Sequence, residues 1–386
     1  MDFKTILLWA QQEENDVIRL RREFHQIPER AFMETQTAAL IRSTLESLQI
    51  PYETVGTGTV ADIKNAAGDA PRLALRADID ALPIEEKTGL PYASVHQGLM
   101  HACGHDAHTA MLLEAVKIVW RNRASLPASV RFIFQPAEEA GGGAVKMIEA
   151  GALDGIREIY CLHVRAQLPA GNLCTRPGYI HAASDGYKIR LIGKGCHGAA
   201  PQNGVDAIVI SAHTVLALQE IISREMGAWD QAVLTIGKIA GGTARNIVCD
   251  EVIMDGTLRT LNEELRERLK KRITEVCQGA AAMLRGQAEV TFSQGYCSCY
   301  NDETTTQKAI DVAEKLFPDV KVAILPLASM GSEDFGFYQK VVPGTKFYIG
   351  TGCPQEIHTP CFVLDEAMLA RGTAFFCALA FGLNMA

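Results

Sequence analysis

Short apolar strands alternate with helices along most of this chain, and one internal stretch breaks the alternation. Strands are predicted at residues 72–79, 130–135 and 159–164, and helices between them at 111–120 and 144–150. Such alternation favours an α/β fold with a mixed, largely parallel sheet. Residues 1–48 are predicted to be helical, with a break near Pro28.

The order changes after His181 to strand, helix, strand, strand, helix, strand. These elements are predicted at residues 184–193, 204–225, 232–239, 251–260, 263–284 and 288–292. This is the order of a ferredoxin-like α+β module. The α/β character then resumes with elements at 303–317, 345–349 and 364–383. We therefore predict a discontinuous catalytic domain, residues 1–181 and 295–386, and an inserted domain, residues 182–294, which fits a chain of 386 residues.

Composition excludes some classes of function. The net charge of −8, without basic runs, disfavours binding to nucleic acid. No run of about 18 apolar residues is present, so no membrane-spanning helix is expected. The first residues lack the pattern of a signal peptide, which predicts a cytoplasmic location. The 11 cysteines are then expected to be reduced, and a special one to be catalytic or metal-bound.

Residues 101–108 form the densest group of reactive side chains. They read His-Ala-Cys-Gly-His-Asp-Ala-His and hold three of the ten histidines. Thiolate, imidazole and carboxylate groups are the preferred ligands of zinc and similar ions. Histidines on a surface or at a helix cap would give the same letters, but the clustering favours a metal site.

Two adjacent carboxylates, Glu138 and Glu139, follow the predicted strand at 130–135 and precede the glycines at 141–143. Neighbouring side chains point in different directions, so one carboxylate can bind a metal while the other faces a substrate. The alternative is an acidic first turn of a helix, which the helix dipole favours. The glycines favour a functional site because they let the backbone approach a ligand closely.

Two isolated histidines gain weight from their position. His163 ends the predicted strand at 159–164, and His358 lies in a loop after the strand at 345–349. A lone histidine is more often structural. These two, however, share with Asp78 and the Glu138–Glu139 pair a place at the C-terminal ends of predicted strands. Open α/β sheets place their sites at that edge.

Other catalytic motifs are absent or weak. The chain has no G-x-S-x-G, Walker A or H-E-x-x-H sequence. Residues 193–198 match G-x-G-x-x-G, but Pro201 follows and the next helix is expected only from residue 204. A dinucleotide site is therefore disfavoured. The pair Cys297 and Cys299 is interpreted as two free thiols in a loop.

Taken together, the residues resemble the M20 metallopeptidase family. Within it they resemble the amidohydrolase branch of N-acyl-amino-acid, hippurate and auxin-conjugate hydrolases. The resemblance covers almost the whole chain. The matching segments are residues 22–29, 76–84, 100–106, 136–139, 193–201, 241–246, 256–259, 330–335 and 357–360.

The resemblance implies a two-metal site in a zinc-peptidase-like α/β domain, with the inserted domain acting as a lid that also dimerises. Cys103 is then expected to bridge the two ions. His105 and Glu139 are expected to bind one ion, and His163 and His358 the other. Zinc is the first expectation, and manganese, cobalt and nickel also suit these ligands.

The resemblance also implies catalytic and substrate-binding roles. Glu138 matches the general base, and His197 matches a histidine that reaches the substrate carbonyl, as an oxyanion stabiliser, in the partner subunit's site. Asn246 and Arg259 match residues of the lid that hold the substrate's oxygens and carboxylate.

The chain departs from the wider family at a few positions. Arg76-Ala77-Asp78 stands where many members have His-x-Asp, so Asp78 is expected just behind the ligands. The bridging position is Cys103 instead of Asp, as in the amidohydrolase branch. Cys196 and Gln202 replace the more usual Gly and His, which leaves substrate preference open.

The sequence thus predicts a cytoplasmic, homodimeric amidohydrolase with two divalent ions per subunit. Its expected substrates are N-acetyl or N-aroyl amino acids, cleaved to a carboxylic acid and an amino acid. One alternative is a dipeptidase or carboxypeptidase of the same family. Another is a non-catalytic metal-binding homologue. An NAD-linked oxidoreductase would rest on residues 193–198 alone.

Overall fold

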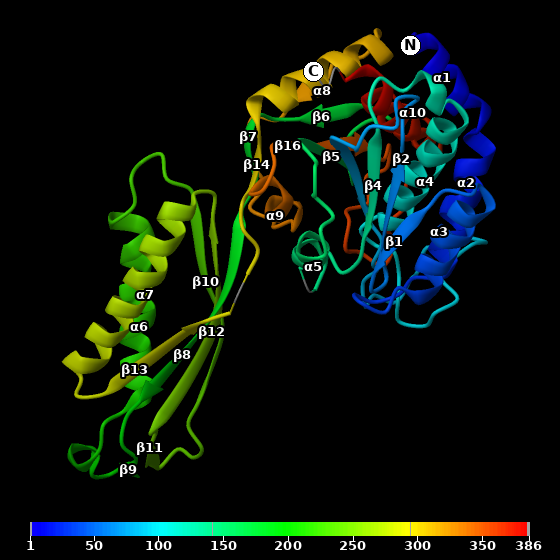
Figure 1. Ribbon diagram of the computed structural model, residues 1–386. Coiled ribbons are helices and arrows are strands. Elements are labelled where there is room, and N and C mark those ends of the chain that lie inside the picture. Colours follow the sequence, from blue (N-terminus) through cyan, green and yellow to red (C-terminus); the bar gives the residue numbers. More distant parts are fainter. Residues whose placement is uncertain (1, 141, 294, 384–386) are drawn as a thin grey trace. The chain divides into compact units, whose positions relative to one another are not determined.

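The computed structural model describes residues 2–140, 142–293 and 295–383 (Figure 1). The chain divides into two compact units. Unit 1 comprises Met1–Ile180, Tyr300–Leu327 and Asp334–Ala386, and unit 2 comprises His181–Cys299 and Ala328–Glu333. Unit 2 covers most of the predicted inserted domain, residues 182–294, and also includes a short later segment, 328–333. The predicted domain boundaries stay a prediction.

Unit 1 is built on an eight-stranded sheet with the order β1-β2-β4-β3-β5-β16-β6-β15. Its strands are β1 (Tyr52–Val55), β2 (Gly58–Ile63), β3 (Leu73–Asp78), β4 (Val130–Gln135), β5 (Glu158–Arg165), β6 (Leu173–Thr175), β15 (Ala323–Ile324) and β16 (Gly344–Gly350). The central strands β4, β3, β5 and β16 pair in parallel, as do β6 and β15, whereas β1 pairs antiparallel with β2, β2 with β4, and β6 with β16. This mixed, largely parallel sheet confirms the predicted α/β class.

The helices of unit 1 are α1 (Phe3–Gln12), α2 (Glu14–Gln26), α3 (Thr35–Ser47), α4 (His105–Arg121), η1 (Arg123–Ser125), α5 (Gly143–Glu149), α8 (Glu303–Leu316), α9 (Phe335–Gln339) and α10 (Ala367–Gly382). Helices α4 and α10 pack against each other and are buried almost all round. A helix that is apolar on every side belongs in a core. A Cβ at Gly372 would lie 2.0 Å from Met111 Sδ, so glycine permits this close contact.

Helix α4 begins at His105, whereas the sequence predicted a helix only from residue 111. Gly104 precedes it with φ of 82°, a left-handed conformation that glycine adopts without strain. The polar residues of the first turn hid the apolar periodicity on which the prediction depended. The cluster of histidines therefore lies partly on a helix whose start is fixed by a glycine.

Unit 2 has a four-stranded antiparallel sheet with the order β10-β12-β8-β13. Its strands are β8 (Ala183–Ile192), β10 (Ala232–Gly241), β12 (Glu251–Thr260) and β13 (Gln287–Phe292), and its helices are α6 (Ala207–Arg224) and α7 (Glu263–Met283). Both helices pack against the sheet and against each other. The chain order and the pairing are those of the predicted ferredoxin-like module.

Shorter elements complete the chain. Strands β9 (Cys196–His197) and β11 (Ile247–Val248) pair with each other, as do β7 (Gly178–His181) and β14 (Cys299–Asn301). A 3₁₀ turn, η2 (Pro201–Asn203), follows β9.

Helix α6 has 18 residues and a mean hydropathy of 1.2, so by length and composition alone it could cross a membrane. A single helix of this kind is weak evidence, and the expectation that no helix spans a membrane stays a prediction. The same composition is found in helices that cover a sheet, and Ile210, Leu218 and Ile221 of α6 lie in the core of unit 2. A single helix of this kind therefore supports no conclusion about membranes.

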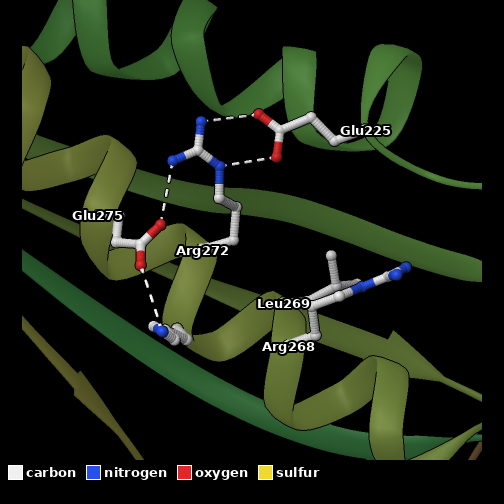
Figure 2. Close-up of a pocket in the computed structure, with 6 residues that line it drawn as sticks. Glu225, Arg268, Leu269, Arg272 and Glu275 are labelled. Atoms are coloured by element: carbon white, nitrogen blue, oxygen red, sulfur yellow. Dashed lines mark hydrogen bonds and ion pairs between the residues drawn. The ribbon is translucent and has the colours of Figure 1, made fainter.

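A surface hollow of about 270 Å³ lies between α6 and α7 (Figure 2). Its lining residues are Glu225, Arg268, Leu269, Lys271, Arg272 and Glu275. Arg272 donates to both carboxylate oxygens of Glu225, at 2.7 and 2.8 Å, and to Glu275 at 3.1 Å. Exposed ion pairs of this kind contribute little to stability. None of the predicted site residues lines the hollow.

Candidate metal centre

Three segments of unit 1 bring sulfur and nitrogen atoms that could bind a metal close together. Cys103 lies two residues before α4 and is buried. Its Sγ is 3.5 Å from Nε2 of His163, near the end of β5, and 3.2 Å from Nε2 of His358, in the loop after β16. His358 has a φ of 61°, a conformation that is costly for a residue with a side chain and that is often found at functional sites.

The remaining two predicted ligands join the same cluster. Glu139 Oε1 lies 3.3 Å from His358 Nε2 and 3.8 Å from His105 Nε2. Two donor sets result, one of Cys103 with His105 and His163, and one of Cys103 with Glu139 and His358, each with its atoms within 4.8 Å of one another. Cys103 belongs to both sets. A further group joins His105 with Glu138 and Glu139, so the pairing of His105 with Glu139 that the resemblance implied stays a prediction.

The electrostatics of this cluster favour a cation. Burial opposes protonation of His105, but Asp78, Asp80 and Glu139 outweigh it and raise its pKa to about 10. Burial and the carboxylates of Glu139 and Glu138 raise the pKa of the Cys103 thiol well above its ordinary value. A positive charge placed here would reverse both shifts.

The donor atoms fit a divalent ion chemically. Thiolate, imidazole and carboxylate are ligands of zinc and related metals. Within the part of the chain that the structure describes, the buried Nε2 of His105 has no hydrogen-bond partner. That atom is left available for a metal because the other ring nitrogen is used elsewhere: His105 Nδ1 lies 3.2 Å from Asp80 Oδ1.

The loop that carries the two glutamates is held by its main-chain N–H groups. The Asp80 carboxylate accepts from the N–H of Glu138 and of Glu139, each at 3.0 Å. Glu34 accepts from the N–H of Ala137 at 2.9 Å, and Ala137 has a φ of 55°. Two buried carboxylates thus fix three successive residues next to the cluster.

Sequence reasoning did not assign a role to Asp80 or Glu34. For Asp80 a signal was present, because it follows β3 in the same Asp-Ile-Asp sequence as Asp78. The resemblance to the family was instead used to assign a role to Asp78. For Glu34 no sequence signal links it to Ala137, which lies 103 residues away.

Asp78 is buried between three basic side chains. It lies 2.6 Å from His108 Nδ1, accepts from Arg76 at 2.6 Å, and is 3.8 Å from His105 Nε2. Burial favours the protonated carboxyl, but His105, Arg76 and His108 together hold the pKa of Asp78 well below its ordinary value. Its expected role behind the ligands stays a prediction.

Gly104 offers a test of how tightly the loop before α4 must fit. A Cβ at this position would lie 2.6 Å from Val164 Cγ2. We expect Gly104→Ala to lower the free energy of unfolding by about 1–2 kcal/mol through left-handed strain, and by a further ~1–3 kcal/mol through overpacking. Urea denaturation measures the loss, and metal binding should weaken with it.

Gly68→Ala is the matched control for this variant. Gly68 has a similar φ of 73°, but a Cβ there would meet nothing within 4 Å. It should therefore show the strain without the overpacking. Equal losses in the two variants would contradict the proposed tight contact with Val164.

The predicted residues of unit 2 do not form one cluster. His197 and Asn246 are neighbours, because β9 pairs with β11 and the Gly198 N–H donates to the Asn246 carbonyl at 2.7 Å. His197 Nδ1 accepts from the Ala199 N–H at 3.1 Å, which leaves the ring proton of the neutral form on Nε2. Arg259 lies on β12 and donates to Ser332 Oγ at 3.0 Å.

Arg259 lies far from this pair along the sheet. On β12 it is paired with Ser184, at the start of β8, whereas Glu251 is paired with Ile192, at the end of β8 that leads to β9. At about 3.3 Å per residue, these two positions on β12 are roughly 26 Å apart. Figure 1 shows β9 and β11 at one end of unit 2. Arg259 and His197 of one copy therefore cannot hold the same small substrate.

Cys196 precedes His197 in β9, and Gln202 lies in η2, which follows β9. Cys196 Sγ donates to the Ala200 carbonyl at 3.4 Å, and Gln202 is exposed within η2. Nothing in these contacts indicates which acyl group the loop would favour.

Known proteins identify the family. The model of peptidase family M20/M25/M40 matches residues 74–381. N-acetyl-L-cysteine deacetylase of Bacillus subtilis (strain 168) is 41% identical over 365 residues, covering 94% of this chain and 86% of the relative. N-acetyldiaminopimelate deacetylase of Lacticaseibacillus paracasei is 39% identical over 371 residues, covering 93% and 96%.

A solved structure from Bacillus subtilis, described as a dinuclear metal binding peptidase from the M20 family, agrees with this. It is 36% identical, matches with a TM-score of 0.85, and covers 96% of this chain and 98% of its own. The chain therefore belongs to peptidase family M20/M25/M40, in its amidohydrolase branch, and is a metal-dependent hydrolase.

Proposed function

We propose that this chain hydrolyses the amide bond of N-acyl amino acids, releasing a carboxylic acid and a free amino acid. The observation that supports this most is the shared Cys103 between two donor sets, with Glu138 beside the ligand Glu139. The names of the two relatives, both deacetylases of N-acetylated amino acids, make an acetyl group the first candidate.

The proposed ligands follow the geometry. Cys103 would bridge two ions, with His105 and His163 completing one site and Glu139 and His358 the other. A divalent pair, when bound, lowers the pKa of a water molecule and polarises an amide carbonyl. The thiolate favours zinc, and manganese, cobalt and nickel remain compatible.

Glu138 is proposed as the general base. It is 6% exposed and its carboxylate belongs to a group with His105 and Glu139 in which the atoms lie within 4.8 Å. It would take the proton of the attacking water and deliver it to the leaving amine. The fixed main chain of residues 137–139 would hold this carboxylate in place.

His197 is proposed to donate its Nε2–H to the developing oxyanion, with Asn246 beside it. Arg259 would hold the carboxylate of the substrate. Because His197 and Arg259 lie at opposite ends of unit 2, we infer that they serve different active sites. His197 would then act in the partner subunit's site, as the resemblance implies.

A homodimer through unit 2 is the partner arrangement that this requires. Strand β10 is an edge strand of its sheet, and an unpaired edge readily takes up another strand. Helix α6 exposes Ile208, Val209 and Leu216, at 50%, 45% and 70%. Val209 and Leu216 are seven residues apart and so share a face of the helix. We propose that α6 and β10 together contact a second copy.

Leu216→Glu tests this surface. A carboxylate in a buried apolar interface costs desolvation energy, so the variant should shift from dimer to monomer in analytical ultracentrifugation. Leu8→Glu is the control, since Leu8 is 51% exposed on α1 of unit 1. A wild-type dimer that persists in Leu216→Glu would contradict the proposed interface.

The function itself is tested with two panels of substrates on the metal-loaded protein. We expect hydrolysis of N-acetyl or N-benzoyl amino acids to exceed that of dipeptides. Preference for dipeptides would instead support the dipeptidase or carboxypeptidase alternative. Bound metal without hydrolysis of either panel would support the non-catalytic homologue. The cytoplasmic location stays a prediction.

A further inference from the structure

The last residues of β5 are not paired with a strand on the side of β3. Strands β3 and β5 pair in parallel from Leu73 with Glu158 to Arg76 with Cys161, and this pairing goes no further. On the other side, β16 remains paired with β5 as far as Arg165. The N–H groups of the last residues of β5 that face β3 therefore need another acceptor, because buried backbone groups are rarely left unpaired.

His108, in the first turn of α4, supplies that acceptor. Its Nε2 accepts from the N–H of Val164 at 2.9 Å. Its Nδ1 lies 2.6 Å from Oδ1 of Asp78, whose other oxygen accepts from Arg76 at 2.6 Å. A ring that accepts at Nε2 and faces a carboxylate at Nδ1 is neutral, with its proton on Nδ1. Both nitrogens are thus used, and His108 has none left for a metal.

Val164 connects this bond to the metal cluster. The ring of the preceding residue, His163, has Nδ1 2.7 Å from the Val164 carbonyl oxygen, to which it donates. Its proton is therefore on Nδ1, and the unprotonated Nε2 faces Cys103 Sγ at 3.5 Å. The rings of His108 and His163 are also in contact, with centroids 4.5 Å apart.

We propose that His108 is a positioning residue for His163. His108 accepts from the Val164 N–H at a position where β5 is no longer paired with β3, and so it fixes the main chain there. The carbonyl of Val164 in turn sets the tautomer and the direction of the His163 ring. Asp78 and Arg76 act through His108, because they fix its own tautomer. This inference rests on the proposed function in one respect: it takes the ion of the proposed metal centre as the group that the His163 ring is oriented to bind.

The tautomers can be measured on metal-free wild-type protein. Nitrogen-15 NMR of histidine rings distinguishes Nδ1–H from Nε2–H, and a His163→Gln variant assigns the signal. We expect both His163 and His108 in the Nδ1–H form. His163 in the Nε2–H form, or His108 with its proton on Nε2, would overturn the proposal. This measurement requires neither bound metal nor enzymatic activity. Failure of this inference can therefore be distinguished from failure of the proposed function.

Two substitutions of His108 separate its two bonds. In His108→Gln the amide oxygen can still reach the Val164 N–H, whereas in His108→Asn the side chain is too short to reach it but can donate to Asp78. Thr109→Val is the control on the same helix, because it removes only the hydrogen bond from Thr109 Oγ1 to the Asp78 carbonyl, 3.0 Å.

Zinc affinity by competition with a chromophoric chelator is the readout. Loss of a partner that orients a metal ligand typically costs about 10–100-fold in affinity, and we expect this loss in His108→Asn, with a mixed tautomer of His163. His108→Gln and Thr109→Val should bind zinc nearly as the wild type does. Unchanged affinity in His108→Asn, or an equal loss in all three variants, would overturn the proposal.

Discussion

Glu138→Gln should leave both metal sites filled but lower kcat by about 10²–10⁴-fold, the usual contribution of a general base. Glutamine keeps the size and polarity of the side chain but cannot take a proton from water. Glu138 is beside the donor sets, and the neighbouring Glu139 carries the carboxylate that lies 3.3 Å from His358, a proposed ligand. The two adjacent glutamates should therefore respond differently.

Glu139→Gln is the matched control because it changes the same atoms one residue away. It should lose metal as well as activity, whereas Glu138→Gln should lose activity alone. Metal content and initial rates at saturating substrate separate the two effects. Full turnover in Glu138→Gln would remove the proposed base.

His197→Ala should lower kcat by about 10²–10³-fold, the loss typical for a donor to an oxyanion. The ring is prepared for this role, because the Ala199 N–H occupies Nδ1 and leaves Nε2–H to donate. His197 is exposed and in unit 2, so metal content should not change. Asn203→Ala, an exposed substitution in the same loop, should retain full activity.

Mixed dimers test whether His197 acts in the partner's site. A dimer that combines a Glu138→Gln chain with a His197→Ala chain would contain one complete site, formed by Glu138 of one chain and His197 of the other. Activity should therefore return when the two inactive variants are co-expressed and the mixed dimer is isolated. If the isolated mixed dimer were as inactive as its parents, His197 would not act across the interface.

The sequence predicted the central strands well. Strand β4 has the predicted bounds, because its mostly apolar run, interrupted by Arg131, ends before Pro136, which cannot continue a strand pattern. Short strands escaped prediction: β1 has four residues with exposed positions in its centre, and β15 has only two. Their pairing comes from tertiary contacts, which a local pattern does not contain.

The position of the site was predictable, but its inner organisation was not. Glu139, His163 and His358 were identified because parallel strands deliver their C-terminal ends to one edge of a sheet. The contribution of Asp80 depends on main-chain groups 58 and 59 residues away, and His108 accepts from an N–H 56 residues away. Contacts between residues so far apart produce no recognisable spacing pattern in the sequence. The division of ligands between two ions likewise depends on distances.

The most direct test of the account is the metal content of the purified protein, combined with its hydrolysis of N-acetyl and N-benzoyl amino acids before and after chelation. We predict about two divalent ions per chain, loss of hydrolysis on chelation, and recovery when metal is restored. No bound divalent metal after reconstitution, or undiminished hydrolysis by the metal-free protein, would contradict the assignment of Cys103, His105, Glu139, His163 and His358 as ligands of a catalytic metal pair.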